Sequence, residues 1–461
     1  MGRSLPPDPS LEHLAKQAKK LLRDARSGDA DALALLPESP PESLKLADAQ
    51  RALAASYGFS SWARLKAEIA ARTPEPEPHE HVAWFGEFQE LVGRVDEAVR
   101  VPDRLDHEVE VLVEAHRAGH RAATVPLRFH TAGLKEKSVD EILAYPVSLE
   151  EAREAVAALY WFPSWDDAQE SSEVIDPGFE AAVDAVVGGD EETLARLLSE
   201  APERVRERSP FGHRSCLLHY VSANGVESWR QRTPARIVEI IQALLTAGAE
   251  VDAPSGAYGA GPHGTPLCLT VSSAHPADAG LQIPIVDALL HGGAAIEGVT
   301  DDGMPLTTAL AFGYLDTARH LVGRGARIRS LTAAAGLGRA DVVRQLLGRP
   351  LDPAVDPFGR LIKDRPALLD RALLQCARTG RTEIASMLLD AGANANASFE
   401  HARTPMHWAA YSGLGDFVEL LLAHGGDPTV ADSYYGSPPS AWAWEGGHKE
   451  LAEWLAGLSP P

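Results

Sequence analysis

Histidine pairs are the residues of this 461-residue chain whose types and spacing could support metal chemistry. His116 and His120 are four residues apart, which would place two imidazoles on one face of a helix, where both could bind zinc. His107 and Glu108 begin like the zinc-protease motif His-Glu-x-x-His, but Val111 stands where the second histidine belongs. No third ligand is indicated for either pair. We therefore predict no metal site and no catalytic residue.

Other reactive motifs are equally incomplete. The Gly-rich stretch 256–264 lacks the Lys-Ser or Lys-Thr ending of a phosphate-binding loop, and no Gly-x-Ser-x-Gly elbow occurs. The cysteines Cys216, Cys268 and Cys376 are odd in number and far apart, which argues against a disulfide framework or a zinc site. We expect them to pack in the core of a protein with no cofactor and no enzymatic activity, in a reducing, cytoplasmic compartment.

Charge narrows the classes of partner. The chain has 43 Lys and Arg against 65 Asp and Glu, a net charge of −22, which repels nucleic acid and anionic membranes. No apolar run approaches about 18 residues, and the first ten residues lack the apolar centre of a signal peptide. A secreted effector would need a transport signal that the sequence does not display. The abundance of Arg and Ala suggests a GC-rich bacterial genome.

The elements that would position these residues recur at intervals of about 25–45 residues beyond residue 178. Four units end in two adjacent leucines followed three positions later by a glycine, as a helix that stops in a left-handed turn requires. The pairs with their glycines are Leu244-Leu245 with Gly248, Leu289-Leu290 with Gly293, Leu388-Leu389 with Gly392, and Leu421-Leu422 with Gly425. This pattern predicts stacked helical pairs rather than one globular core.

The best-preserved unit reads Thr-Pro-Met-His-Trp-Ala-Ala over 404–410, followed by Gly413, and it resembles the ankyrin repeat. The resemblance implies an all-α, ankyrin-repeat solenoid of helix–turn–helix units over 178–461, and it favours binding over chemistry. About eight units are predicted. They begin near Phe179, Ser215, Thr265, Pro305, Leu331, Asp370, Thr404 and Pro438. His219 and His407 occupy the family's histidine position, whose implied role is structural, through hydrogen bonds near the turns between repeats.

Three insertions interrupt the array, at Val226–Arg236, His275–Gln282 and Pro350–Pro366. Insertions in a solenoid fall in loops on one face, often the binding face. The first insertion carries Trp229, Arg230, Gln231 and Arg232, a cationic patch on an acidic protein. It would receive an acidic peptide or pair with the chain's own carboxylates, and the second interpretation is favoured.

The N-terminal third lacks the ankyrin pattern but has its own repeat: residues 49–62 match 152–165 at a constant offset of 103. Both copies predict an Ala-rich helix, an aromatic turn, and a second helix entered through Ser-Trp. We expect an N-terminal helical domain over 1–72, a Pro- and Glu-rich linker over 73–81, and a second helical region over 82–175. Their aromatics would form small cores. An unrecognised enzymatic or ligand-sensing activity in 82–175 is the alternative to a purely interacting protein.

Large aromatic side chains mark the expected contact surface, because such anchors are enriched where proteins bind one another. The predicted partner-binding residues are Trp408, Tyr411, Tyr434, Tyr435, Trp442, Trp444, Trp229 and Arg232. Trp408 and Trp442 occupy equivalent positions in consecutive units and could form a stacked ladder. For Trp442 and Trp444 of the last unit, capping of the array is the favoured interpretation and partner binding is the alternative. The sequence thus predicts a non-enzymatic, monomeric protein-interaction module. Its concave groove would bind a protein or peptide of unknown identity, and neither nucleic acid nor membrane.

Overall fold

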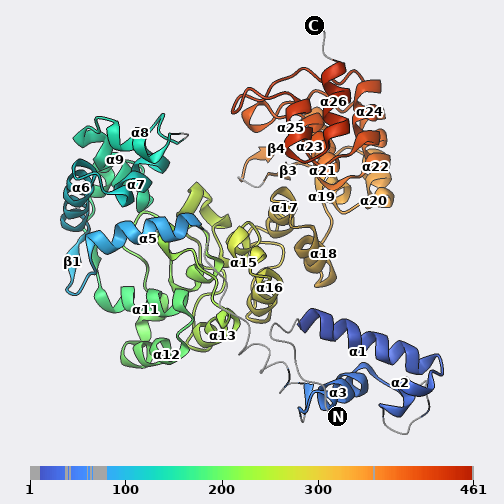
Figure 1. Cartoon of the computed structure of the whole chain (residues 1–461), viewed down its shortest axis with the longest axis horizontal. Helices are drawn as coiled ribbons and strands as arrows, with labels where there is room; N and C mark the ends of the chain where they lie inside the picture. The colour runs from blue at the N-terminus through green and yellow to red at the C-terminus, as the bar shows by residue number, and fades with distance from the viewer. Residues whose placement is uncertain are drawn as a thin grey trace. The chain divides into compact units, whose positions relative to one another are not determined.

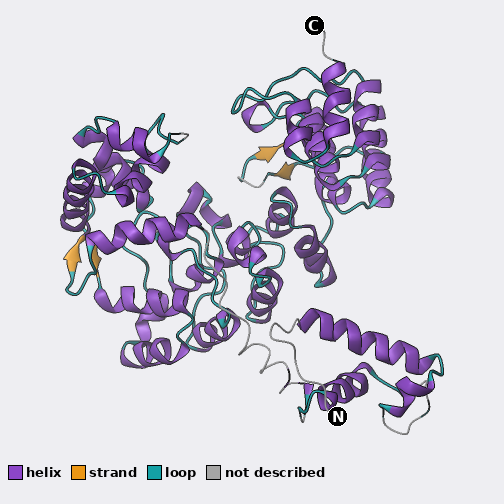
Figure 2. Ribbon diagram, in the orientation of Figure 1, coloured by secondary structure: helices purple, strands orange, loops and turns teal. Residues whose placement is uncertain are grey.

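A computed structural model describes residues 11–36, 40, 43–59, 61–62, 65, 80–135, 137–356 and 359–458. The chain divides into two compact units, 1–77 and 78–461. Helices dominate both units, and the strands of the described residues form two short antiparallel pairs, β1 with β2 and β3 with β4 (Figures 1 and 2). The predicted all-α repeat fold is therefore confirmed. No described helix is long and apolar enough to cross a membrane.

The first unit contains the helices α1 (Leu11–Arg26), α2 (Ala30–Ala34) and α3 (Leu46–Ser56). Its core combines small residues such as Ala18 and Ala25 with Leu44 and Leu53. The predicted small aromatic core is present, since Tyr57, Phe59 and Trp62 pack against these residues. Most of the helix expected after Ser61, and residues 73–79 of the expected linker, lie outside the described residues.

The second unit begins with a helical region that ends near residue 175. Its elements are α5 (Glu80–Val92), β1 (Val99–Arg100), α6 (Val101–Arg117), η2 (Arg121–Ala123), α7 (Thr124–His130), α8 (Val139–Ala144), α9 (Leu149–Leu159), α10 (Trp165–Gln169) and β2 (Val174–Ile175). Because α5 starts at Glu80, the last two positions of the expected linker are helical. The α9 helix begins and ends 103 residues after α3, as the internal repeat predicts. Ser164 caps α10 by accepting a hydrogen bond from the Asp167 amide at 3.1 Å.

Eight helical pairs follow one another in the described part of the array. They are α11 (Pro177–Gly188) with α12 (Glu191–Glu200), η4 (Leu217–Ser222) with α13 (Ile237–Thr246), α14 (Pro266–Thr270) with α16 (Gln282–His291), α17 (Met304–Ala311) with α18 (Leu315–Gly323), α19 (Leu331–Gly336) with α20 (Ala340–Leu347), α21 (Arg365–Thr379) with α22 (Thr382–Asp390), α23 (Pro405–Tyr411) with α24 (Gly415–Ala423), and α25 (Pro439–Glu445) with α26 (Lys449–Gly457). A left-handed glycine, such as Gly413 with φ 69°, joins most pairs.

The connections between pairs carry the remaining elements. These are η3 (Pro202–Arg206), η5 (Ser228–Arg230), η6 (Ala257–Gly259), η7 (Gly261–His263), α15 (Ala274–Asp278), β3 (Ala354–Val355), β4 (Leu361–Ile362) and η8 (Glu400–Ala402). The predicted insertions thus become η5, α15 and the β3–β4 hairpin. The hairpin lies beside the first helices of the C-terminal pairs (Figure 1).

The apolar core of the array is divided at α19. One cluster runs from Phe179 to Ala333 and the next from Leu331 to Leu455. Between Leu331 and Gly336 the buried side chains of α19 are alanines, so little apolar volume joins the two clusters. Gly336 also lets α21 approach closely, since a Cβ atom there would lie 2.7 Å from Cγ of Gln375.

Candidate binding site

A groove of about 800 Å³ runs along the C-terminal half of the array. Its walls come from the first helices of four consecutive pairs, α17, α19, α21 and α23, and from the β3–β4 hairpin. The third insertion therefore lies on the groove face, as expected for a binding face. Its volume falls within the usual range of ligand-binding clefts.

The groove floor follows the repeat. Its polar and aromatic side chains stand five and two residues before the turn glycine of each pair: Gln375 and Arg378 on α21, and Trp408 and Tyr411 on α23. Trp442 occupies the position five residues before the turn glycine in the next pair. Side chains at equivalent positions of stacked units lie next to one another, so this register brings residues distant in sequence into one row.

The row is a ladder in which the guanidinium groups of Arg378 and Arg403 contact the rings of Trp408 and Trp442. The Arg378 guanidinium lies 4.4 Å from the Trp408 ring centroid. Trp408 and Trp442 are neighbours, as predicted, but their rings meet edge to face with centroids 5.4 Å apart and are not stacked. Arg403 lies 5.2 Å from the Trp442 ring. Such contacts stabilise the rings in fixed orientations, while Tyr411 remains 46% exposed at the groove edge.

A buried carboxylate holds the end of the ladder. Asp432 accepts hydrogen bonds from the Trp442 indole at 3.0 Å and from the Tyr434 and Tyr435 amides at 2.9 and 2.7 Å. Burial raises the pKa of Asp432, but these hydrogen bonds outweigh it and hold the pKa below the ordinary value. The Asp432 carboxylate therefore stays ionised, and it fixes both the Trp442 indole and the loop that carries Tyr434 and Tyr435.

Two side chains of α21 reach across α19. The Gln375 amide donates to the Leu310 carbonyl at 2.8 Å, and Arg378 donates to the Ala311 carbonyl at 2.7 Å. This reach is possible because the intervening helix has Gly336 at the position equivalent to Arg378. The arginine is thus fixed at its head group, with its face on Trp408.

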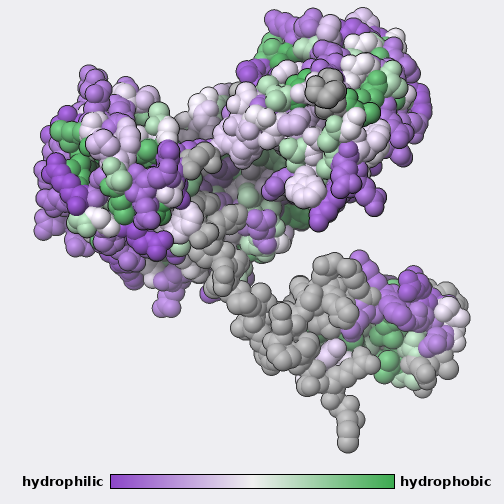
Figure 3. Space-filling model, turned by 45° about the horizontal axis from the view of Figure 1, so that its top comes forward, coloured by the Kyte–Doolittle hydropathy of each residue, from purple (hydrophilic) through white to green (hydrophobic). Residues whose placement is uncertain are grey.

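The other predicted C-terminal aromatics lie outside the groove lining. Tyr435 and Trp444 are 66% and 56% exposed. Tyr434 is half-buried, and the Lys135 ammonium of the helical region lies 5.1 Å from its ring centroid. The surface visible in Figure 3 is mostly hydrophilic, with small hydrophobic patches over the C-terminal repeats.

The first insertion is placed differently from the expected free surface. Trp229 is half-buried and packs edge-on against Tyr160 of the helical region, with centroids 5.5 Å apart. Arg230 is buried, and Arg232 alone of the four is exposed. The ring of Trp229 thus packs in the contact between the helical region and the array, and its role in binding a partner stays a prediction.

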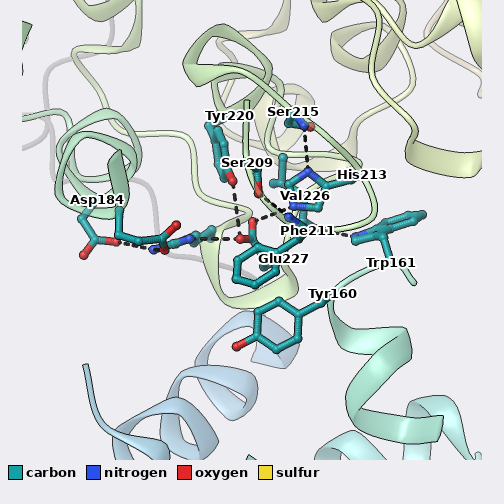
Figure 4. A network of polar contacts seen from close by, with 12 residues as sticks. Tyr160, Trp161, Asp184, Ser209, Phe211, His213, Ser215, Tyr220, Val226 and Glu227 are labelled. Carbon is teal, nitrogen blue, oxygen red and sulfur yellow. Dashed lines mark hydrogen bonds and ion pairs between the residues drawn. The ribbon is translucent and has the colours of Figure 1, made fainter. Parts of the chain in front are cut away.

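Arg230 anchors a buried polar network at this junction (Figure 4). Its guanidinium pairs with Glu227 at 3.0 Å, Glu180 at 2.7 Å and Asp184 at 3.2 Å. The favoured interpretation of the cationic patch, internal pairing, is confirmed for this residue. Burial raises the pKa of Glu227, but Arg230 and the neighbouring His213 outweigh it and lower the pKa to about 2.

His213 completes the network. Its Nδ1 accepts a hydrogen bond from the Ser215 amide at 3.1 Å, and its Nε2 faces Glu227 at 3.5 Å. Beside it, the turn after α9 enters the array: the Trp161 indole donates to the Val226 carbonyl at 3.3 Å, and the Gly212 amide donates to the Tyr160 carbonyl at 2.9 Å. The network therefore joins two parts of the second unit.

The histidines considered for chemistry do not converge. His116 contacts the Ile142 carbonyl at 2.9 Å through Nε2, whereas His120 accepts from the Ala122 amide at 3.3 Å. Among the described residues, no three His, Cys, Asp or Glu side chains form a group that could hold a metal ion. Glu108 is buried and hydrogen-bonded to Tyr160 and to Arg104. Its buried setting makes it a core carboxylate of the region.

The two repeat histidines have the structural role that the resemblance implies. His219 Nδ1 accepts from the Cys216 amide at 3.1 Å, and its Nε2 contacts the Ala253 carbonyl at 2.9 Å. His407 Nδ1 accepts from the Thr404 amide at 3.1 Å. Burial lowers the pKa of His219 to about 4 and lowers that of His407, so both rings are neutral at pH 7.

The cysteines are free and buried, as predicted. Burial raises the pKa of Cys268 to about 12 and raises the pKa values of Cys216 and Cys376. Thiols in this state are poor nucleophiles. They belong to the packing of the first helices.

Sequence reasoning did not single out Arg378, Arg403 or Phe312 as groove residues. Arg378 could have been found by its position, two residues before Gly380, which is the position of Tyr411 before Gly413. Arg403 gives no such signal, since it precedes α23 in an irregular turn.

The fold and groove together define a helical-repeat protein with a concave binding surface. The ankyrin-repeat family, matched by a sequence profile of three copies, corresponds to residues 331–432 and 373–459. The rat cyclin-dependent kinase 4 inhibitor B is 35% identical over 127 residues, which cover 27% of this chain and 88% of that protein. The chain therefore belongs to the ankyrin-repeat family.

Other similarities are shorter. The human ARF GTPase-activating protein GIT2 is 42% identical over 88 residues, and its human paralogue GIT1 is 39% identical over 104 residues. These alignments cover 19% and 22% of the present chain but only 12% and 13% of the two relatives. The chain thus spans only a small part of the length of these two relatives.

Proposed function

We propose that this protein is a non-enzymatic interaction module that binds another protein through the groove between α17 and α23. The observation that carries the proposal is the ladder of Arg378, Trp408 and Trp442, with Tyr411 open at its edge. The ring contacts and the bond from Arg378 to Ala311 fix the ladder in advance. Binding to a preformed surface loses little side-chain entropy.

The relatives support this class of function. Cyclin-dependent kinase 4 inhibitor B is named as an inhibitor of another protein, and the present chain matches most of its length. Exposed Tyr435 and Trp444 would extend the contact beyond the groove. We further propose a monomer in a reducing, cytoplasmic compartment, in keeping with three free buried thiols, and a bacterial source, in keeping with the Arg- and Ala-rich composition.

Affinity capture from native lysate tests the binding surface. The bait is the full chain, compared with a Trp408→Ala plus Tyr411→Ala variant, and captured proteins are quantified by mass spectrometry. Truncating central aromatic anchors typically weakens binding by about 2 kcal/mol or more, so partners should be depleted about thirtyfold. Trp454→Ala, an exposed tryptophan on α26, is the matched control. Equal recovery by the double variant would rule out this groove.

A further inference from the structure

The groove contains positive charge that the rest of the chain leaves uncompensated. Two of its arginines, Arg360 and Arg371, pair with the buried Asp356 at 2.7 and 3.2 Å. For Arg378 and Arg403, no described carboxylate lies within ion-pairing distance, and Nε of each is buried without a hydrogen-bond partner. Among the described arginines that line the groove, these two are the ones without an ion pair, on a chain of net charge −22.

The two guanidinium groups are held in place by the groove itself. Arg378 lies on the Trp408 face and donates to the Ala311 carbonyl, while Arg403 lies on the Trp442 face. Glu400 also lines the groove and is exposed. Burial lowers the pKa of Arg378; Glu400 opposes this effect and Arg403 adds to it. The local field is therefore one of two neighbouring cations with a single carboxylate at the rim.

The geometry points to an acidic peptide segment of a partner protein as the occupant of this groove. Its carboxylates pair with Arg378 and Arg403, and a neighbouring aromatic or aliphatic side chain packs on Trp408 and Tyr411. Charge-assisted bonds between arginine and carboxylate are stronger than neutral ones and select for the planar anion. This inference rests on the proposed function and specifies the chemistry of its partner.

A peptide fits the observations better than the other polyanions. Nucleic acid presents phosphate along its whole length, which the net charge of −22 repels beyond the groove. A second copy of this chain carries the same net charge and is repelled in the same way. A short acidic segment meets only the local positive field, and the volume of about 800 Å³ suits a few side chains.

Selection of random peptides on the full chain tests the inference. Displayed peptides are selected on the wild type, on Arg378→Gln plus Arg403→Gln, and on Trp408→Ala plus Tyr411→Ala. Arg344→Gln is the matched control, because Arg344 is an exposed arginine of the second-helix layer that pairs with Glu383. The most enriched peptide and a copy with Gln in place of each Glu and Asn in place of each Asp are then titrated by fluorescence anisotropy. Thermal unfolding checks that each variant is folded.

We expect Asp and Glu to be enriched beside an aromatic or aliphatic residue. Affinity should fall about tenfold or more with the double arginine variant or the Gln and Asn copy, decline with added salt, and stay unchanged in Arg344→Gln. Enrichment of neutral or basic peptides that depends on Trp408 and Tyr411 would overturn the acidic partner but leave the proposed function intact. If no selected peptide binds the wild type better than the Trp408→Ala plus Tyr411→Ala variant, both the acidic partner and the proposed function are overturned.

Two further outcomes would reassign the occupant. Tighter binding of a single-stranded oligonucleotide than of the enriched peptide, lost in Arg378→Gln plus Arg403→Gln, would replace the peptide by nucleic acid. Dimerisation of the wild type in light scattering, lost in the same variant, would assign the groove to a second copy of the chain. Either result contradicts an acidic peptide as the partner.

Discussion

The junction network around Arg230 and the groove around Arg378 are built from the same kinds of side chain and treat charge in opposite ways. Arg230 is buried and pairs with Glu180, Glu227 and Asp184. Arg378 is fixed by a carbonyl and an indole but meets no carboxylate. The first arrangement satisfies its charges within the chain. The second keeps a cation available to a partner.

The difference also explains where aromatic residues are useful. Trp229 and Tyr160 pack in the contact between the helical region and the array, so their rings stabilise the fold. Trp408 and Tyr411 line the groove and border open space. Residue type alone therefore does not separate a binding surface from a buried contact; the pairing of the neighbouring arginine does.

Replacing the central arginine of each region should give the largest contrast. Arg230→Met leaves the buried Glu227 and the half-buried Glu180 without this cation, and should lower the free energy of unfolding by about 3–5 kcal/mol. Arg378→Met loses one bond to a carbonyl and should cost about 1 kcal/mol. Urea unfolding of both variants measures this. Similar losses in the two variants would show that Arg378 is also a structural residue.

Acid should destabilise the array through His219 more than through His407. The folded pKa of His219, about 4, lies below the unfolded value of about 6.5. The unfolded chain therefore takes up a proton first as the pH falls, and stability present above pH 6.5 is lost progressively down to pH 4, by about 3 kcal/mol.

The control for this prediction is a histidine that cannot titrate. In His219→Gln, the fall in unfolding free energy between pH 6.5 and pH 4 should be shallower than in the wild type. His407→Gln should flatten it less, because the bond to the Ser437 carbonyl and the charge of Asp432 oppose the effect of burial on the pKa of His407. An unchanged slope in His219→Gln would contradict a neutral buried ring.

Adding a methyl group at Gly336 of α19 should lower the free energy of unfolding moderately. In Gly336→Ala, the added Cβ atom would meet Cγ of Gln375 at 2.7 Å and force α21 outward, at a cost of about 1–3 kcal/mol. Ala335→Gly, on the same helix, removes one buried methyl group and serves as a comparison. If Gly336→Ala were as stable as the wild type, the close approach of the two helices would not be required.

Removing the exposed Trp444 should have the smallest effect. The side chain is 56% exposed and contacts the Lys449 ammonium at 5.4 Å. Trp444→Ala should change the free energy of unfolding by less than about 0.5 kcal/mol, whereas Trp442→Ala also removes the bond to Asp432 and should cost more. Equal losses would indicate that Trp444 caps the array as a structural element.

Much of the fold could be predicted because each repeat has local requirements. Residues within one unit determine three of its features: the left-handed turn at Gly413, the proline that begins α23, and the hydrogen bond that His407 makes to Thr404. The ladder partners Trp408 and Trp442 follow from the same register. The bonds from Gln375 and Arg378 to the end of α17 could not be predicted in this way, because they depend on how closely α21 approaches α19.

The packing of the first insertion could not be predicted from the local sequence pattern either. Its composition indicates a cationic surface, but Arg230 pairs with Glu180 from α11 and Trp229 packs against Tyr160, and both of these partners are distant in sequence. The contact between the helical region and the array adds a second core that includes Phe211. Periodicity within either region contains no information about that contact.

The reach of Gln375 and Arg378 to Leu310 and Ala311 alters how the array should unfold. Stability in repeat proteins is usually a sum of terms within units and between immediate neighbours, which allows a weak unit to open and separate the array. Here the sixth pair is bonded to the fourth across the fifth, where the apolar core is thinnest. The weakest unit is thereby bridged by its neighbours, and the halves on either side are coupled into one cooperative transition.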